Sequence, residues 1–183
     1  LTLSDISDGM LRDARRALGA RDSRFSFAAF DCEKIPAASE SYDLVIANHV
    51  LFYCDNLENV CKEVRRVLKP GGRFLCSTYG NSHMKEISQL VSQFDERIVL
   101  SANKLYEKFG RENGAQVLEP WFSRVEWISY EDGLLVSDPE PLISYILSCH
   151  GNQNRYLLDH YKEFRSFVKK KTEKGFHITK DAG

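Results

Sequence analysis

YDLVIANHVLFYCDNLENVCKEVRRVLKPGGRFLCS, residues 42–77, contains a strand, a helix and a second strand in one run. Residues 42–47 are a short apolar stretch of the kind that is buried on both faces in parallel sheets. From residue 57 to residue 68 the apolar side chains recur at spacings of three and four, which predicts a helix with one buried face. Proline and glycine in residues 69–72 stop that helix, and residues 73–77 predict the next strand.

The chain before this segment repeats the same alternation. Residues 1–5 alternate like a strand, Ser7 or Asp8 can cap a helix that reaches Leu18, and residues 24–30 form a second short strand. Alternating strands and helices predict an α/β fold: a doubly wound, mostly parallel sheet with helices on both faces. Ligands of such sheets bind just beyond the carboxyl ends of the strands. We therefore expect a site at the residues that follow strands: Asp5, Asp31, Asn48 and Tyr79.

The second half of the chain is less regular. A helical insertion at about residues 80–120 is expected to shape a lid. Later elements should include a last strand that pairs antiparallel with an earlier one. The elements expected after residue 80 are helices at 84–94 and 104–113, a strand at 125–130, a turn at 131–133, helices from 139 and over 155–171, and a strand at 176–180. We expect one domain over residues 1–183.

Composition excludes several classes of function. The 183 residues carry 25 lysines and arginines against 26 aspartates and glutamates, so no overall field favours nucleic acid or an anionic membrane. The Lys169–Lys171 run is best interpreted as a solvated helix end. We expect no nucleic-acid and no membrane partner, and leave a homo-oligomer open.

The five cysteines include no CxxC pair, which suits a reducing compartment. We interpret them as small core residues and expect a cytoplasmic protein, since no stretch approaches a membrane span and no leader opens the chain. His150, His160 and His177 lack acidic or cysteine partners at ligand spacing, so no metal site is expected.

Four ordered motifs resemble the class I S-adenosylmethionine-dependent methyltransferases, particularly the small-molecule type. They are LSDIS at 3–7, FDCEKIP at 30–36, YDLVIANHVL at 42–51 and EVRRVLKPGG at 63–72. The resemblance covers about half of the chain in the family's order. It implies S-adenosylmethionine as cofactor and an unidentified small-molecule methyl acceptor.

The resemblance also implies roles for particular residues. Asp5 corresponds to the carboxylate that accepts hydrogen bonds from both ribose hydroxyls, and Ile6 to the apolar residue under the adenine. Asp31 matches the acidic residue near the adenine amino group, and Cys32 the position whose backbone N–H faces a ring nitrogen. Asn48 lies at the methionine end of the cofactor. The competing interpretation of Asp5 and Asp31 is that they are helix-cap or turn residues.

Methyl transfer from a sulfonium needs a base only when the acceptor must lose a proton. Candidate bases are His49 and Tyr79, and candidate substrate contacts are Tyr53 and His83. All four could face one crevice. Alternatively, His49 starts a helix, and Tyr79 and His83 cap or line the insertion.

The sequence departs from the family in one respect. Members carry a strand and a GxG loop before the position of Asp5, because only glycine lets the backbone approach the cofactor so closely. These 183 residues contain no such loop, and the missing first strand would be a central one, between the strands that end at Asp5 and Ala47. We expect an N-terminal extension in the natural protein and leave open whether this chain alone binds cofactor.

Two other functions compete with an enzyme of this family. A non-catalytic methyltransferase-fold module for interaction or assembly would have lost the loop altogether. A nicotinamide-dependent dehydrogenase would share the acidic residue after the second strand, but does not account for Asp31-Cys32 or residues 68–72.

Overall fold

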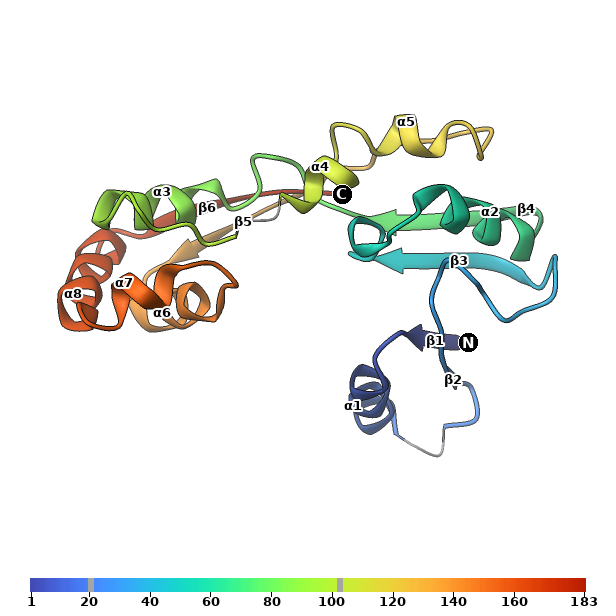
Figure 1. Cartoon of the computed structure of the whole chain (residues 1–183), viewed down its shortest axis with the longest axis horizontal. Coiled ribbons are helices and arrows are strands. Elements are labelled where there is room, and N and C mark those ends of the chain that lie inside the picture. Colours follow the sequence, from blue (N-terminus) through green and yellow to red (C-terminus); the bar gives the residue numbers. More distant parts are fainter. Residues whose placement is uncertain (20–21, 102–103) are drawn as a thin grey trace. The chain divides into compact units, whose positions relative to one another are not determined.

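The computed structural model describes residues 1–19, 22–101 and 104–183 (Figure 1). The chain divides into two compact units. The first unit comprises residues 1–76 and 117–124, and the second comprises residues 77–116 and 125–183. A single domain with a helical insertion at about 80–120 therefore stays a prediction.

The first unit begins with a strand, a helix and a strand, as expected. These are β1 (Thr2–Asp5), α1 (Asp8–Leu18) and β2 (Ser26–Ala29). The side chain of Ser7 caps α1 by accepting a hydrogen bond from the Met10 N–H at 3.4 Å. β1 and β2 pair in parallel, with Asp5 opposite Ala29. Parallel pairing brings the carboxyl ends of both strands to one edge.

The segment that decided the fold class forms a strand, a helix and a strand in the predicted order, but its last strand begins at Leu68 and not at Arg73, so residues 69–72 lie inside that strand. β3 (Tyr42–Asn48) leads through a short 3-10 helix, η1 (Leu51–Tyr53), to α2 (Leu57–Val67) and β4 (Leu68–Ser77). The Asn56 side chain caps α2. One face of α2 is buried, and it consists of Val60, Cys61, Val64 and Val67. β3 and β4 are hydrogen-bonded neighbours whose arrows point the same way (Figure 1).

The prediction that residues 42–47 are buried on both faces is wrong for this structure. The side chains of Leu44 and Ile46 on β3 are 45% and 56% exposed. Within the described ranges, β3 pairs with β4 and with neither β1 nor β2. Its apolar surface therefore lacks the neighbouring strand and covering layer that a central position would supply.

The second unit contains an antiparallel sheet of β5 (Tyr130–Val136) and β6 (Phe176–Ala182). An antiparallel last strand is confirmed, but the strand predicted at 125–130 starts at Tyr130 instead. The predicted turn at 131–133 lies inside β5. Pairing with β6 overrides the Asp-Gly turn signal: Asp132 forms an ion pair with Lys180 at 3.1 Å.

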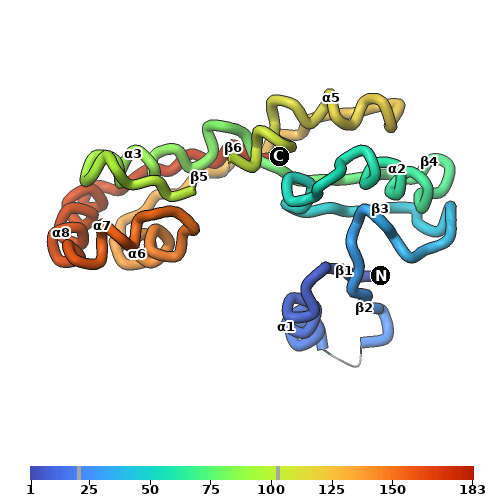
Figure 2. The backbone as a smooth tube through the Cα atoms, viewed as in Figure 1, coloured from blue at the N-terminus to red at the C-terminus, as the bar shows by residue number. Residues whose placement is uncertain are grey.

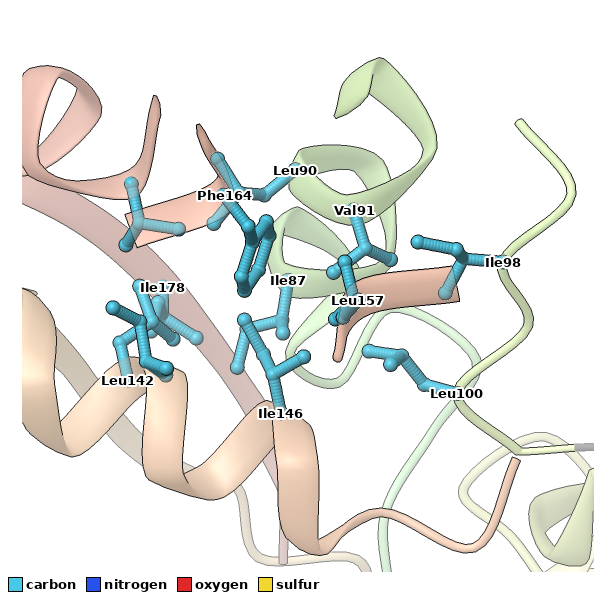
Figure 3. Close-up of a cluster of buried hydrophobic side chains, with 12 residues drawn as sticks. Ile87, Leu90, Val91, Ile98, Leu100, Leu142, Ile146, Leu157, Phe164 and Ile178 are labelled. Atoms are coloured by element: carbon cyan, nitrogen blue, oxygen red, sulfur yellow. The ribbon is translucent and has the colours of Figure 1, made fainter. Parts of the chain in front are cut away.

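Among the described residues, six helices lie between β4 and β6 in the sequence. They are α3 (Lys85–Phe94), α4 (Leu105–Lys108), α5 (Gly114–Leu118), α6 (Pro139–Ser148), α7 (Gln153–Leu157) and α8 (Tyr161–Thr172). Residues from α3, α6, α7, α8 and β6 meet in a single apolar cluster (Figure 3). Phe164 of α8 lies fully buried in it, with its ring edge-on to that of Phe94 at 5.1 Å. This cluster is the core of the second unit.

Two helix predictions in this unit are wrong in extent. A helix over 104–113 does not form, because the Asn113 side chain accepts from the Gly110 N–H and donates to the Glu107 carbonyl, both at 2.7 Å. Those bonds end α4 after one turn. The helix expected over 155–171 is divided into α7 and α8, with a turn closed by the His160 N–H and the Leu157 carbonyl.

Candidate functional site

The predicted cofactor carboxylates follow two neighbouring parallel strands. Asp5 is the last residue of β1 and stands opposite Ala29, two positions before Asp31. The Phe30 N–H donates to the Asp5 carbonyl at 3.3 Å and so extends the pairing to the strand ends. The structure therefore brings the two positions to the same edge of one sheet, as the sequence predicted.

Each carboxylate also organises the turn after its strand. Oδ1 of Asp5 accepts from the Ser7 N–H at 2.8 Å, and Oδ1 of Asp31 accepts from the Glu33 N–H at 2.9 Å. This is the turn role that the competing interpretation gave them. Among the described residues, Oδ2 of both side chains accepts no hydrogen bond from the protein, so one oxygen of each remains for a ligand. Ile6 lies inside the first of these turns, between Asp5 and Ser7, and is 75% exposed.

Figure 2 shows the course of the backbone from β2 to β3, and hydrogen bonds hold this segment against α2. Arg66 donates to the Ala37 and Ile35 carbonyls at 2.7 and 2.8 Å, and Glu63 accepts from the Ile35 N–H at 2.8 Å. Glu63 and Arg66 also bind each other at 2.7 Å. Glu33, on the same segment, accepts from the Asn56 N–H at 2.8 Å. These contacts fix the backbone of the residues that follow Cys32.

Glu63 and Arg66 are site-supporting residues that the sequence analysis missed. Their spacing of three on a helix is a signal for an ion pair, but nothing in it reveals the carbonyls that they bind across the fold. The hydrogen bond from Arg66 lowers the pKa of Glu63, and the bond from the Ile35 N–H acts in the same direction while burial opposes both.

Acidification should loosen this contact. Because the pKa of Glu63 in the folded protein is below its ordinary value of 4.5, its contribution to stability is complete above about that pH and disappears as the pH falls through the folded pKa. Glu63→Gln should therefore speed amide hydrogen exchange at Ile35 at neutral pH, and the difference from wild type should shrink in acid. Glu58→Gln, on the same helix, is the control. A difference that does not change with pH would contradict this account.

The end of β3 carries the other first-unit candidates. Asn48 is its last residue, and His49 adopts a left-handed backbone conformation with φ of 50°. That conformation is costly for a residue with a Cβ, and such strain is often found at functional positions. The His49 ring lies 6.2 Å from that of Phe52, and Tyr53 stacks edge-on against Phe52 at 4.7 Å. Tyr53 is mostly exposed.

Tyr79 and His83 belong to the second unit. Their rings lie 5.2 Å apart, and Nδ1 of His83 accepts from the Asp181 N–H at 3.2 Å. Tyr79 also forms an isolated antiparallel bridge with Ala182. Both residues thus help to hold the end of β6. Their meeting with His49 and Tyr53 in one crevice stays a prediction.

Two hollows are lined by none of the predicted cofactor residues. One of about 350 Å³ lies over β5 and β6, and one of about 490 Å³ lies beside α2 near Trp121.

In the described ranges no group of three histidine, cysteine, aspartate or glutamate side chains could hold a metal ion. No described helix is long and apolar enough to span a membrane.

The first part of this chain is similar in sequence to known proteins. Residues 1–76 match a family model described as a methyltransferase domain. The chain is 37% identical over 83 residues to the malonyl-[acyl-carrier protein] O-methyltransferase of Methylococcus capsulatus, covering 45% of this chain and 30% of that protein. For the enzyme of the same name from Enterobacter lignolyticus, identity is 34% over 97 residues, covering 53% and 37%. The chain thus spans only about a third of these relatives.

Solved structures share the fold over almost the whole chain. A protein from Bacillus halodurans, assigned as a methyltransferase, matches with a TM-score of 0.61 at 15% identity, covering 99% of this chain and 79% of that one. One from Anaeromyxobacter dehalogenans, assigned as a type II methyltransferase, gives 0.60 at 18% identity, covering 99% and 77%. The fold is thus an α/β methyltransferase fold. The match of residues 1–76 to the methyltransferase domain model agrees with the resemblance carried by the four motifs.

Proposed function

We propose that this protein transfers a methyl group from S-adenosylmethionine to a small-molecule acceptor. The observation that carries the proposal is the parallel register of β1 and β2, inside the matched residues 1–76. It sets Asp5 and Asp31 at the carboxyl ends of neighbouring strands, where ligands of such sheets bind.

The residues present suit an adenosine. Oδ2 of Asp5 accepts no bond from the described protein and can accept from ribose hydroxyls, while exposed Ile6 offers an apolar surface for adenine. The Cys32 N–H donates to no backbone carbonyl in the described ranges and is the group that would face a ring nitrogen. A strand and a glycine-rich loop of the kind that members of this family carry would complete the cradle.

The chemistry requires mainly orientation. When bound, the cofactor supplies a methyl group on a positively charged sulfur, so its leaving group is already activated. The protein's task is to align the acceptor with that methyl group and to exclude water. We assign Asn48 to the methionine end of the cofactor. His49 or Tyr79 would take a proton from an acceptor that must lose one, and Tyr53 and His83 would contact the acceptor.

The relatives suggest which acceptor to test first. Several are named malonyl-[acyl-carrier protein] O-methyltransferases, and another, 36% identical over 98 residues, is a highly reducing polyketide synthase from Calcarisporium arbuscula. We propose a small acyl compound as acceptor. The near-neutral charge argues against nucleic acid, and the free cysteines support a cytoplasmic location.

Calorimetry tests the proposal directly. S-adenosylmethionine and S-adenosylhomocysteine are titrated into the chain extended before Leu1 by a strand and a glycine-rich loop. Saturable binding is expected, followed by methyl transfer to a malonyl thioester or a related acyl compound. A titration without heat, confirmed by equilibrium dialysis, would overturn the proposal in favour of a non-catalytic interaction module.

A further inference from the structure

Two cysteine thiols lie in contact beside the predicted adenine position. Sγ of Cys32 and Sγ of Cys54 are 3.2 Å apart, although the residues are separated by 22 positions in the chain. A disulfide bond is about 2.05 Å long, so the sulfurs need to approach by only about 1 Å to form one. Sequence analysis interpreted both as small core residues, and their proximity is a product of the fold.

The surrounding contacts hold the two thiols together. Glu33 follows Cys32 and binds the backbone of Asn56, two residues after Cys54. Beyond it, Glu63 and Arg66 hold the backbone of Ile35. The residues that follow Cys32 and those that follow Cys54 are therefore held together next to the thiol contact, which reduces the loss of chain freedom when a bond forms.

The two thiols are also chemically unequal. Either sulfur can donate the hydrogen bond between them, and this bond lowers the pKa of Cys32 and raises that of Cys54. Burial and the carboxylates of Asp31 and Glu33 act against ionisation of both thiols. Burial raises the pKa of Cys61 and that of Cys76 to about 11. Since the thiolate is the nucleophile, Cys32 is the more reactive sulfur. Cys32 is also half-buried, whereas Cys54 is 8% exposed.

We propose that Cys32 and Cys54 form a reversible disulfide that weakens cofactor binding when the protein is oxidised. The bond forms by exchange with a low-molecular-weight disulfide such as oxidised glutathione. The Cys32 thiolate attacks one sulfur of glutathione disulfide and releases one glutathione. Cys54 then loses its proton to water and attacks the Cys32 sulfur, which releases the second glutathione. Two protein thiols are oxidised and one glutathione disulfide is reduced.

The effect on the cofactor rests on the proposed function. Bond formation draws Cys32 toward Cys54, and the Cys32 N–H is the group assigned to an adenine ring nitrogen. Because Cys32 directly follows Asp31, the bond also shifts the backbone next to that carboxylate. Regulatory bonds of this kind are the usual form of disulfide in a reducing compartment. We expect the oxidised protein to bind S-adenosylmethionine about tenfold more weakly, in the ordinary range of coupling between two sites.

Thiol counting tests the bond without reference to the cofactor. The 183-residue chain is exposed to oxidised glutathione, freed of it, unfolded and titrated for thiols, and its peptides are mapped by mass spectrometry. Of the five cysteines in the sequence, three should remain free, with one bridge joining Cys32 to Cys54. Cys32→Ser and Cys54→Ser should each abolish the bridge, whereas Cys149→Ser in the second unit should not. Five free thiols, a bridge elsewhere, or a lasting glutathione adduct on Cys32 would overturn the proposal.

The effect on the cofactor is tested by measuring S-adenosylmethionine binding to the chain extended by the strand and glycine-rich loop, in its oxidised, reduced and re-reduced forms. Affinity should fall on oxidation and return with dithiothreitol. Equal affinity in the bridged and reduced forms would overturn the regulatory role. Absence of binding in both forms would overturn the proposed function and the regulation with it, while the thiol count would still decide whether the bridge exists.

Discussion

Alanine in place of Asp5 is expected to weaken S-adenosylmethionine binding about 100-fold, since two hydrogen bonds to a charged acceptor, each worth about 1.5 kcal/mol or more, would be lost. One carboxylate can accept from both hydroxyls of a ribose, and no neutral side chain of similar size supplies the same charge. Asp5 stands at the end of β1, opposite Ala29 of β2, so its removal should lower the affinity for the cofactor. Calorimetric titration of the chain extended by the strand and glycine-rich loop measures this affinity.

Two further variants separate ligand binding from folding. Asp5→Asn keeps an oxygen that can accept from the Ser7 N–H, and so preserves the start of α1 while removing the charge. Asp13→Ala removes a carboxylate from the exposed side of α1, where Asp13 forms an ion pair with Arg16, and should leave the affinity unchanged. An Asp5→Ala protein that binds like wild type would exclude this residue from the site.

Phe164→Ala should destabilise the second unit by about 3–5 kcal/mol, the usual loss when a large buried ring is truncated. Phe164 has no exposed surface and lies in the cluster that joins α3, α6, α7 and β6 (Figure 3). Its removal leaves a cavity and also breaks the edge-on contact with Phe94. Amide hydrogen exchange of α8 and β6 at increasing urea concentration measures the change within this unit alone.

Tyr161→Ala is the matched control for this change. Tyr161 lies on the same helix one turn earlier and is 36% exposed, so its truncation should cost far less. A loss below about 1 kcal/mol for Phe164→Ala would mean that the cluster is not the core of this unit.

The candidate site could be predicted only in part from the sequence. Asp5 and Asp31 were found because each follows a strand, and parallel strands end at the same edge of a sheet. Two other features have no signal in the local sequence, because they join residues far apart in the chain. They are the contact of Cys32 with Cys54 and the hydrogen bonds from Arg66 to the Ile35 and Ala37 carbonyls.

The sequence by itself determined the α/β class, the ends of the strands near Asp5 and Asp31, and the helix of residues 57–67. Local apolar spacing and capping residues, which set these features, act over a few positions. Only the tertiary structure decided where α4 ends, where β5 begins and which thiols meet. Asn113 reaches back to the Glu107 carbonyl, β6 draws residues 131–133 into a strand, and the turn after β2 meets η1. Each outcome depends on a partner that local sequence does not contain, so side-chain and strand pairing overrode local propensity there.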